Sequence, residues 1–136
     1  MELHTTYSMF QVLNFEFIEV PDDPKILFYQ REVFSQPLNI SVADVVGIKC
    51  VCSNGNPAPK LTWQLNSLPI GGTAERHVIT HGLYTAELKW DQINNHFLVK
   101  GPIQLSCIAS HPRLHNNRVV RVRAILQNHG LYRITY

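Results

Sequence analysis

The chain has 136 residues, of which 45% are hydrophobic and 16% are charged. This length allows one ordinary domain rather than two full ones, and the composition excludes a highly charged, disordered chain. The formal net charge of +2 does not by itself favour a nucleic-acid or anionic-membrane partner.

The N-terminal part of the sequence contains one strand pattern and one candidate joint. FQVLNFEFIEV, residues 10–20, is typical of a strand and precedes the segment VPDDP, whose prolines suggest an interdomain joint. We therefore interpret 1–21 as an N-terminal extension that holds the last strand of a preceding domain. We expect one domain over 22–127 and a C-terminal tail or linker over 128–136.

Neither a leader peptide nor a membrane span is predicted. The chain starts with MELHTTYSMF, which lacks a basic start followed by an unbroken apolar stretch. No run approaches the roughly 18 apolar residues that a membrane span needs. If the protein acts outside the cell, we expect this chain to be one piece of a longer product.

From residue 25 onward, apolar and polar residues alternate with period two, and turn residues interrupt the pattern roughly every 8 to 12 residues. Two weaker strands are predicted at 25–31 and 37–42. Clearer ones are predicted at 45–52, 61–65, 75–81, 83–90, 102–110 and 118–126, and no convincing helix is predicted. About seven strands with this spacing predict an all-β fold, an antiparallel sandwich.

Each of the clearer strands has an apolar face, because successive side chains point to opposite sides of a strand. The expected inward residues are Val46, Ile48, Cys50, Cys52, Leu61, Trp63, Leu65, Tyr84, Ala86, Leu88, Trp90, Ile103, Leu105, Cys107, Ala109, Val120, Val122, Ala124 and Leu126.

Three cysteines permit one disulfide and one free thiol. They are too few for a disulfide scaffold and lack the four-ligand spacing of a structural zinc site. Because Cys50 and Cys52 project to the same side of one strand, alternation allows either of them to be the partner of Cys107.

The pattern of an inward cysteine, a tryptophan on the next strand and a late inward cysteine is the hallmark of the immunoglobulin sandwich. The segments CVCSNGNPAPKLTW and IQLSCIASHPRL resemble constant-2-type immunoglobulin domains of adhesion receptors such as nectins, nephrin-like proteins and sidestep-like proteins. The resemblance covers about residues 22–126. Leu105 departs from it, because a tyrosine corner would place Tyr there.

The resemblance implies which cysteines are bonded. In such domains the inward residue two positions before the bonded cysteine is usually aliphatic, as Ile48 is before Cys50, and a polar turn follows a few residues later, as at Asn54. It therefore implies a Cys50 to Cys107 disulfide, with Trp63 packed on it. The predicted core around this bond consists of Trp63, Ile48, Leu61 and Leu105.

The sequence gives little indication of catalysis or metal binding. His77 and His81, like His111 and His115, are four residues apart, a spacing of about 13 Å along a strand, which is too long to share one ion unless the chain turns. Only the loop HPRLH, residues 111–115, could fold back in that way. No nucleophile motif or acid/base pair is present. We predict no catalytic residue, no metal site and no cofactor.

The sequence also contains one candidate modification site and one local excess of positive charge. Asn39-Ile40-Ser41 is an N-glycosylation sequon, so we expect Asn39 to carry a glycan if the protein is secreted. Arg121 and Arg123 project from the outer face of the last strand, with Arg113 and Arg118 nearby. They could simply protect a strand from unwanted pairing, or they could bind an acidic protein surface or a sulfated glycan.

The resemblance implies a function in noncovalent recognition. We expect an extracellular recognition or spacer module that contacts a cell-surface protein, such as another immunoglobulin-domain protein, and inserts into no membrane. Candidate contact elements are 54–59, 64–71 and 111–117, and the candidate partner-binding residues are Gln64, Asn66, Arg113, His115, Arg121 and Arg123.

Two alternatives stay open. The first is an intracellular structural immunoglobulin module of a filament or scaffold protein, which the sequon and the matched cysteines disfavour. The second is a co-stimulatory-type immune ligand or secreted decoy, which a preceding variable-type domain would favour.

Overall fold

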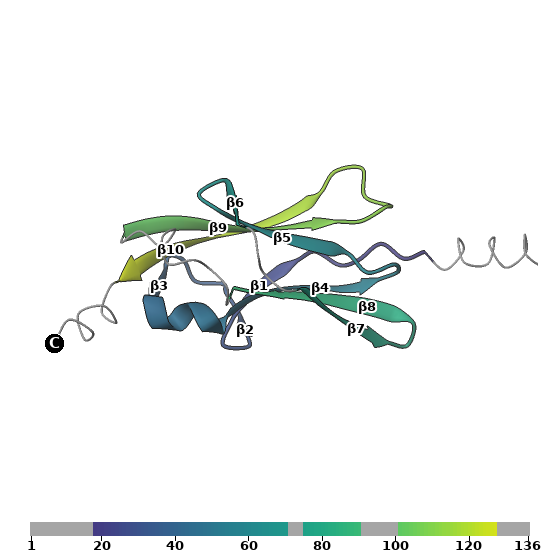
Figure 1. Ribbon diagram of the computed structural model, residues 1–136, viewed down its shortest axis with the longest axis horizontal. Coiled ribbons are helices and arrows are strands. Elements are labelled where there is room, and N and C mark those ends of the chain that lie inside the picture. The colour runs from purple at the N-terminus through teal and green to yellow at the C-terminus, as the bar shows by residue number, and fades with distance from the viewer. Residues whose placement is uncertain (1–17, 71–74, 91–100, 128–136) are drawn as a thin grey trace, which may run out of the picture.

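The computed structural model describes residues 18–70, 75–90 and 101–127. These residues form two facing β-sheets and one short 3₁₀ helix (Figure 1). The elements are β1 (Lys25–Phe28), β2 (Arg31–Glu32), β3 (Leu38–Ser41), η1 (Val42–Gly47), β4 (Ile48–Gly55), β5 (Lys60–Leu65), β6 (Leu68–Ile70), β7 (Glu75–Thr80), β8 (Leu83–Lys89), β9 (Gly101–Ser110) and β10 (Arg118–Gln127). In these parts of the chain, no helix is long and apolar enough to cross a membrane.

One sheet, which we call the back sheet, has the strand order β2-β1-β4-β8-β7. The other, which we call the front sheet, has the order β3-β10-β9-β5-β6. All neighbouring strands are antiparallel except β3 and β10, which run parallel. The structure thus confirms the predicted all-β sandwich. It adds the short strands β2 and β6, which are too brief for alternation to reveal.

The core lies between the sheets, where the alternating apolar side chains of both layers meet. The four predicted core residues, Ile48, Leu61, Trp63 and Leu105, are each at most 3% exposed. Trp90, which follows β8, faces Trp63 across the core with ring centroids 6.0 Å apart. Burial of two such large rings makes a major contribution to the hydrophobic stabilisation.

The strand predicted at 45–52 begins later than expected, because 42–47 form η1. Val46, predicted to face the core, is 63% exposed, and that prediction was wrong. The Asp44 carboxylate accepts hydrogen bonds from both the backbone N–H and the hydroxyl of Ser41, each at 3.0 Å. The bond from the Ser41 N–H to the Asp44 side chain is one half of a capping box, the arrangement in which the third residue of a helix accepts the N–H of the residue that precedes it. The sequence S-V-A-D was the signal that the prediction missed.

The segment before β1 is fastened to the loops at one end of the sandwich. Glu19 and Asn56 exchange two backbone hydrogen bonds of 3.0 Å. Arg118 donates to the Pro21 carbonyl oxygen at 2.6 Å and lies 3.2 Å from the Asp23 carboxylate. The predicted joint is therefore bonded to the domain along its length. Most of the predicted extension 1–21, and the tail 128–136, lie outside the described residues.

Candidate functional site

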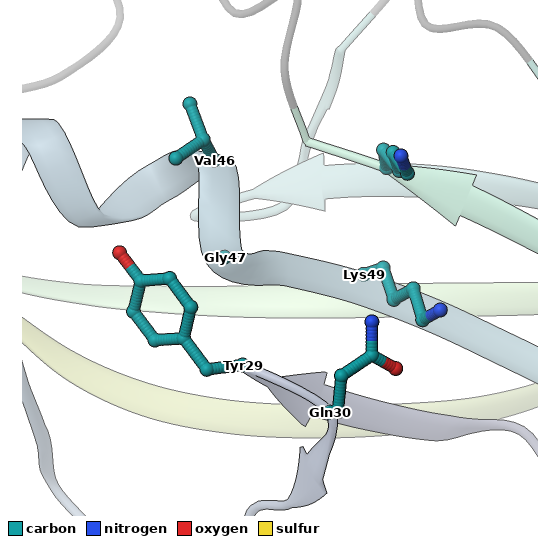
Figure 2. Close-up of a pocket in the computed structure, with 6 residues that line it drawn as sticks. Tyr29, Gln30, Val46, Gly47 and Lys49 are labelled. Carbon is teal, nitrogen blue, oxygen red and sulfur yellow. The ribbon is translucent and has the colours of Figure 1, made fainter.

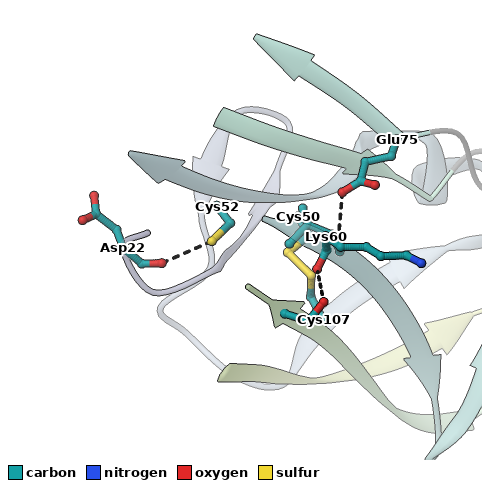
Figure 3. The surroundings of a disulfide bond; sticks show 8 residues. Asp22, Cys50, Cys52, Lys60, Glu75 and Cys107 are labelled. Atoms are coloured by element: carbon teal, nitrogen blue, oxygen red, sulfur yellow. Dashed lines mark hydrogen bonds between the residues drawn. A yellow bond between two sulfur atoms is a disulfide. The ribbon is translucent and has the colours of Figure 1, made fainter. Parts of the chain in front are cut away.

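Figure 3 shows the disulfide that joins the two sheets. Cys50 of β4 and Cys107 of β9 are bonded, with Cα atoms 6.3 Å apart, and both are fully buried. This confirms the predicted disulfide. Trp63 is the register partner of Cys107 on β5, so its ring lies beside the bond. The bond spans 57 residues, a loop for which chain-entropy arithmetic gives about 4 kcal/mol of stabilisation.

The third cysteine is a free and buried thiol. Cys52 donates a weak hydrogen bond to the Asp22 carbonyl oxygen at 3.2 Å (Figure 3). Burial is the main cause that raises the pKa of Cys52 to about 11, and the nearby Arg118 charge opposes the rise. Because the thiolate is the reactive form of cysteine, Cys52 is inert at neutral pH.

Four of the six predicted partner-binding residues come together on the outward surface of the front sheet, which we call the front face. Arg121 pairs in register with Ser106, and Ser106 with Gln64, so these three side chains form one row. The next row contains Arg123 and its partner Gln104. Asn66 extends that row, because its side-chain oxygen accepts a hydrogen bond from the Gln104 N–H at 2.7 Å.

The front face is positive and has no counter-charge of its own. Its five strands contain no Asp or Glu. Arg121 and Arg123 are exposed and form no ion pair within the described residues. In the back sheet, by contrast, the Lys49 ammonium is only 2.7 Å from the Glu87 carboxylate. The two guanidinium groups are therefore available to bind carboxylates from another molecule.

The other two predicted residues lie elsewhere. Arg113 and His115 are exposed on the β9–β10 loop, which precedes Arg118 at the start of β10. Within this loop His111 is buried, with Nε2 2.9 Å from the Pro57 carbonyl oxygen and Nδ1 accepting the Arg113 N–H. This histidine fixes the loop against the 54–59 turn, so much of that turn serves internal contacts. The described residues contain no group of three or more metal-binding side chains.

A shallow hollow of about 380 Å³ lies at one end of the front face, and we call it the edge hollow. Two side-chain amides bond to backbone N–H groups of residues that line it. The Asn66 oxygen accepts the Gln104 N–H at 2.7 Å, and the Gln36 oxygen accepts the Arg123 N–H at 2.8 Å. The lining is largely apolar apart from Arg123 and two amides, and comprises Pro37, Asn66, Pro102, Ile103, Gln104, Arg123, Ala124 and Ile125.

A second hollow of about 380 Å³ lies beside η1 (Figure 2). Two of its four polar side chains are engaged within the protein. Lys49 is paired with Glu87, and the Tyr29 hydroxyl donates to the Asp44 carboxylate at 3.1 Å. The Tyr29 ring lies so close to Gly47 that a Cβ at that position would meet it at 2.7 Å. This hollow is therefore a weaker candidate for ligand binding than the front face.

The two-sheet arrangement is similar to solved structures of immunoglobulin domains. The crystal structure of Rst D1-D2 matches with 20% identity and a TM-score of 0.57, and the match covers 79% of this chain and 49% of that one. The chain thus spans about half the length of that structure. A likeness at this identity establishes the fold, an immunoglobulin-like β-sandwich, and no more.

Two further structures match with TM-scores too low to support an argument. The complex of Dpr2 Ig1-Ig2 with DIP-Theta Ig1-Ig3 has 12% identity and a TM-score of 0.43, and covers 79% of this chain and 34% of that one. The tandem Ig repeats of Dlar have 16% identity and a TM-score of 0.32, and cover 81% of this chain and 49% of that one. No protein-family model and no curated protein sequence matches the chain.

Proposed function

We propose that this immunoglobulin-like domain is an extracellular recognition module of a cell-surface adhesion protein and binds an acidic protein surface through its front face. The observation that carries the proposal is the pair Arg121 and Arg123, exposed on a sheet whose strands contain no acidic residue. The module acts by noncovalent contact alone.

Two observations support an extracellular location. A buried disulfide between the sheets forms and persists in oxidising compartments and is rare in the cytosol. Asn39 of the sequon is exposed on β3, an edge strand, where a glycan would extend into solvent. Both observations disfavour the intracellular structural module as an alternative.

The composition of the front face favours a protein partner over a sulfated glycan. Arg121 is flanked by the neutral side chains of Ser106 and Gln64 and, along β10, by Val119, which is 37% exposed. An arginine among apolar and amide groups is typical of protein interfaces. A polysulfated chain would be better matched by an extended track of cations. Among the described residues this face offers Arg121 and Arg123 close together and Lys60 apart from them, since Lys60 pairs with Ser110, four residues along β9 from Ser106.

The experiment is a binding assay against a panel of purified ectodomains, run with the domain on beads. Charge reversal of the pair, R121E/R123E, should weaken binding to any ectodomain that the unaltered domain binds by at least about tenfold, because the partner surface is proposed to be acidic and charge pairs buried at interfaces are strongly coupled. The matched control is K89E, which reverses an exposed charge on β8 of the back sheet. Binding that survives R121E/R123E, or that K89E weakens equally, would refute the proposal, and binding to heparin beads alone would favour the glycan.

A further inference from the structure

The sequon asparagine lies next to the edge hollow. On β3, Leu38 and Ile40 point inward, and Asn39 between them points outward and is exposed. Asn39 is the register partner of Ile125 on β10, and side chains at paired positions of neighbouring strands lie side by side on the same face. Ile125 lines the hollow, and so does Pro37, two residues before Asn39.

We propose that Asn39 carries an N-linked glycan whose first sugar packs into the edge hollow. The proposal rests on the secretory location proposed above, because the sugar is added on that route. The hollow offers apolar surface from Pro37, Pro102 and Ile125 to the nonpolar face of a sugar ring. Arg123 and Gln104 at its rim offer hydrogen-bond donors to the sugar oxygens and the acetamide group.

A glycan in this position has two consequences for the front sheet. It covers β3, which forms one edge of the sheet and would otherwise present unpaired backbone groups to another chain. It also covers part of the surface around Arg123 and leaves the Arg121 row open. The partner surface therefore centres on Arg121 and Gln64, because Ser106 between them is only 3% exposed. Arg121 lies four residues along β10 from Ile125, the register partner of Asn39.

The variants must separate loss of the sugar from loss of the η1 cap, because the Ser41 hydroxyl also donates to Asp44. Asn39→Gln removes the sequon at an exposed position and leaves the cap intact. Ser41→Thr keeps both the sequon and a hydroxyl for Asp44, and serves as the matched control. Ser41→Ala would remove both at once and is not used.

The experiment uses the chain secreted from a eukaryotic host. Peptide mass spectrometry first measures occupancy of Asn39. Hydrogen exchange of the β3 amides is then compared in three forms: the intact glycoprotein, the protein trimmed by an endoglycosidase to one N-acetylglucosamine, and N39Q. We expect the intact and trimmed forms to exchange about threefold more slowly than N39Q at β3, with S41T like wild type. The amides of β7, in the other sheet, serve as the internal reference.

The outcomes divide as follows. Slower exchange in both sugar-bearing forms, together with nuclear Overhauser contacts from the acetamide methyl to Ile125, supports the inference. An unoccupied Asn39 in the secreted protein overturns it, and so does equal exchange in all three forms. Either result leaves the effect of R121E alone on partner binding unchanged, because Arg121 does not line the hollow, so failure here is distinguishable from failure of the proposed function.

Discussion

Removal of the disulfide is expected to be the most damaging small change to this domain. The variant is C50A/C107A, which leaves Cys52 as the sole thiol. The bond closes a loop of 57 residues, and its loss should lower the free energy of unfolding by about 4 kcal/mol. Single domains are stable by only about 5 to 15 kcal/mol, so the variant should be close to unfolding at room temperature.

The assay is urea denaturation followed by tryptophan fluorescence, since Trp63 and Trp90 are both fully buried and report on the core. The control is C52A, which removes a buried sulfur but no covalent bond and should cost about 1 kcal/mol. If C50A/C107A does not fold, the contribution of the disulfide can be measured instead as the difference in unfolding free energy between the oxidised and the reduced forms of C52A. A loss below about 1 kcal/mol, or a C52A loss as large as that of the double variant, would refute the reasoning.

Three further predictions concern single side chains. D44N should cost about 1 kcal/mol at neutral pH, as loss of a cap does. Hydrogen bonds from Ser41 hold the pKa of Asp44 below its usual value. The difference in unfolding free energy between wild type and D44N should therefore be complete above about pH 4 and vanish as the pH falls through the lowered pKa. Urea denaturation that gives equal differences at pH 7 and in strong acid would contradict this. Because burial raises the pKa of Cys52 to about 11, iodoacetamide at pH 8 should label it only on unfolding, and rapid labelling of the native protein would argue against its burial. R118A should speed hydrogen exchange in residues 19–24 by about tenfold, whereas R113A, at an exposed position, should not; equal exchange in the two variants would show that the bonds of Arg118 to Pro21 and Asp23 do not hold this segment.

The sheets could be predicted because period-two alternation records which side of each strand is buried. It placed Leu61, Trp63 and Leu105 in the core without any knowledge of pairing. It failed at Val46, where a helix of six residues interrupts the alternation and the local cap decides the conformation. The parallel pairing of β3 with β10 could not be predicted, because strand partners far apart in the chain leave no local signal.

The front face was only partly predictable for a similar reason. Alternation showed that Arg121 and Arg123 point outward, but only the register of three strands shows that Arg121 and Gln64 share one row. Arg118 was grouped with them in the sequence, yet it is bonded to Pro21 and Asp23 at the start of the domain. A charge excess in a sequence is therefore not the same as a free charge on a surface.

The most direct test of the proposed function is a hydrogen-exchange footprint of this domain with and without an ectodomain that it binds. A partner bound to the front face predicts slower exchange in β5, β9 and β10, centred on Arg121 and Gln64, with β7 and β8 unchanged. Protection confined to β7 and β8, or to the β9–β10 loop, would contradict it.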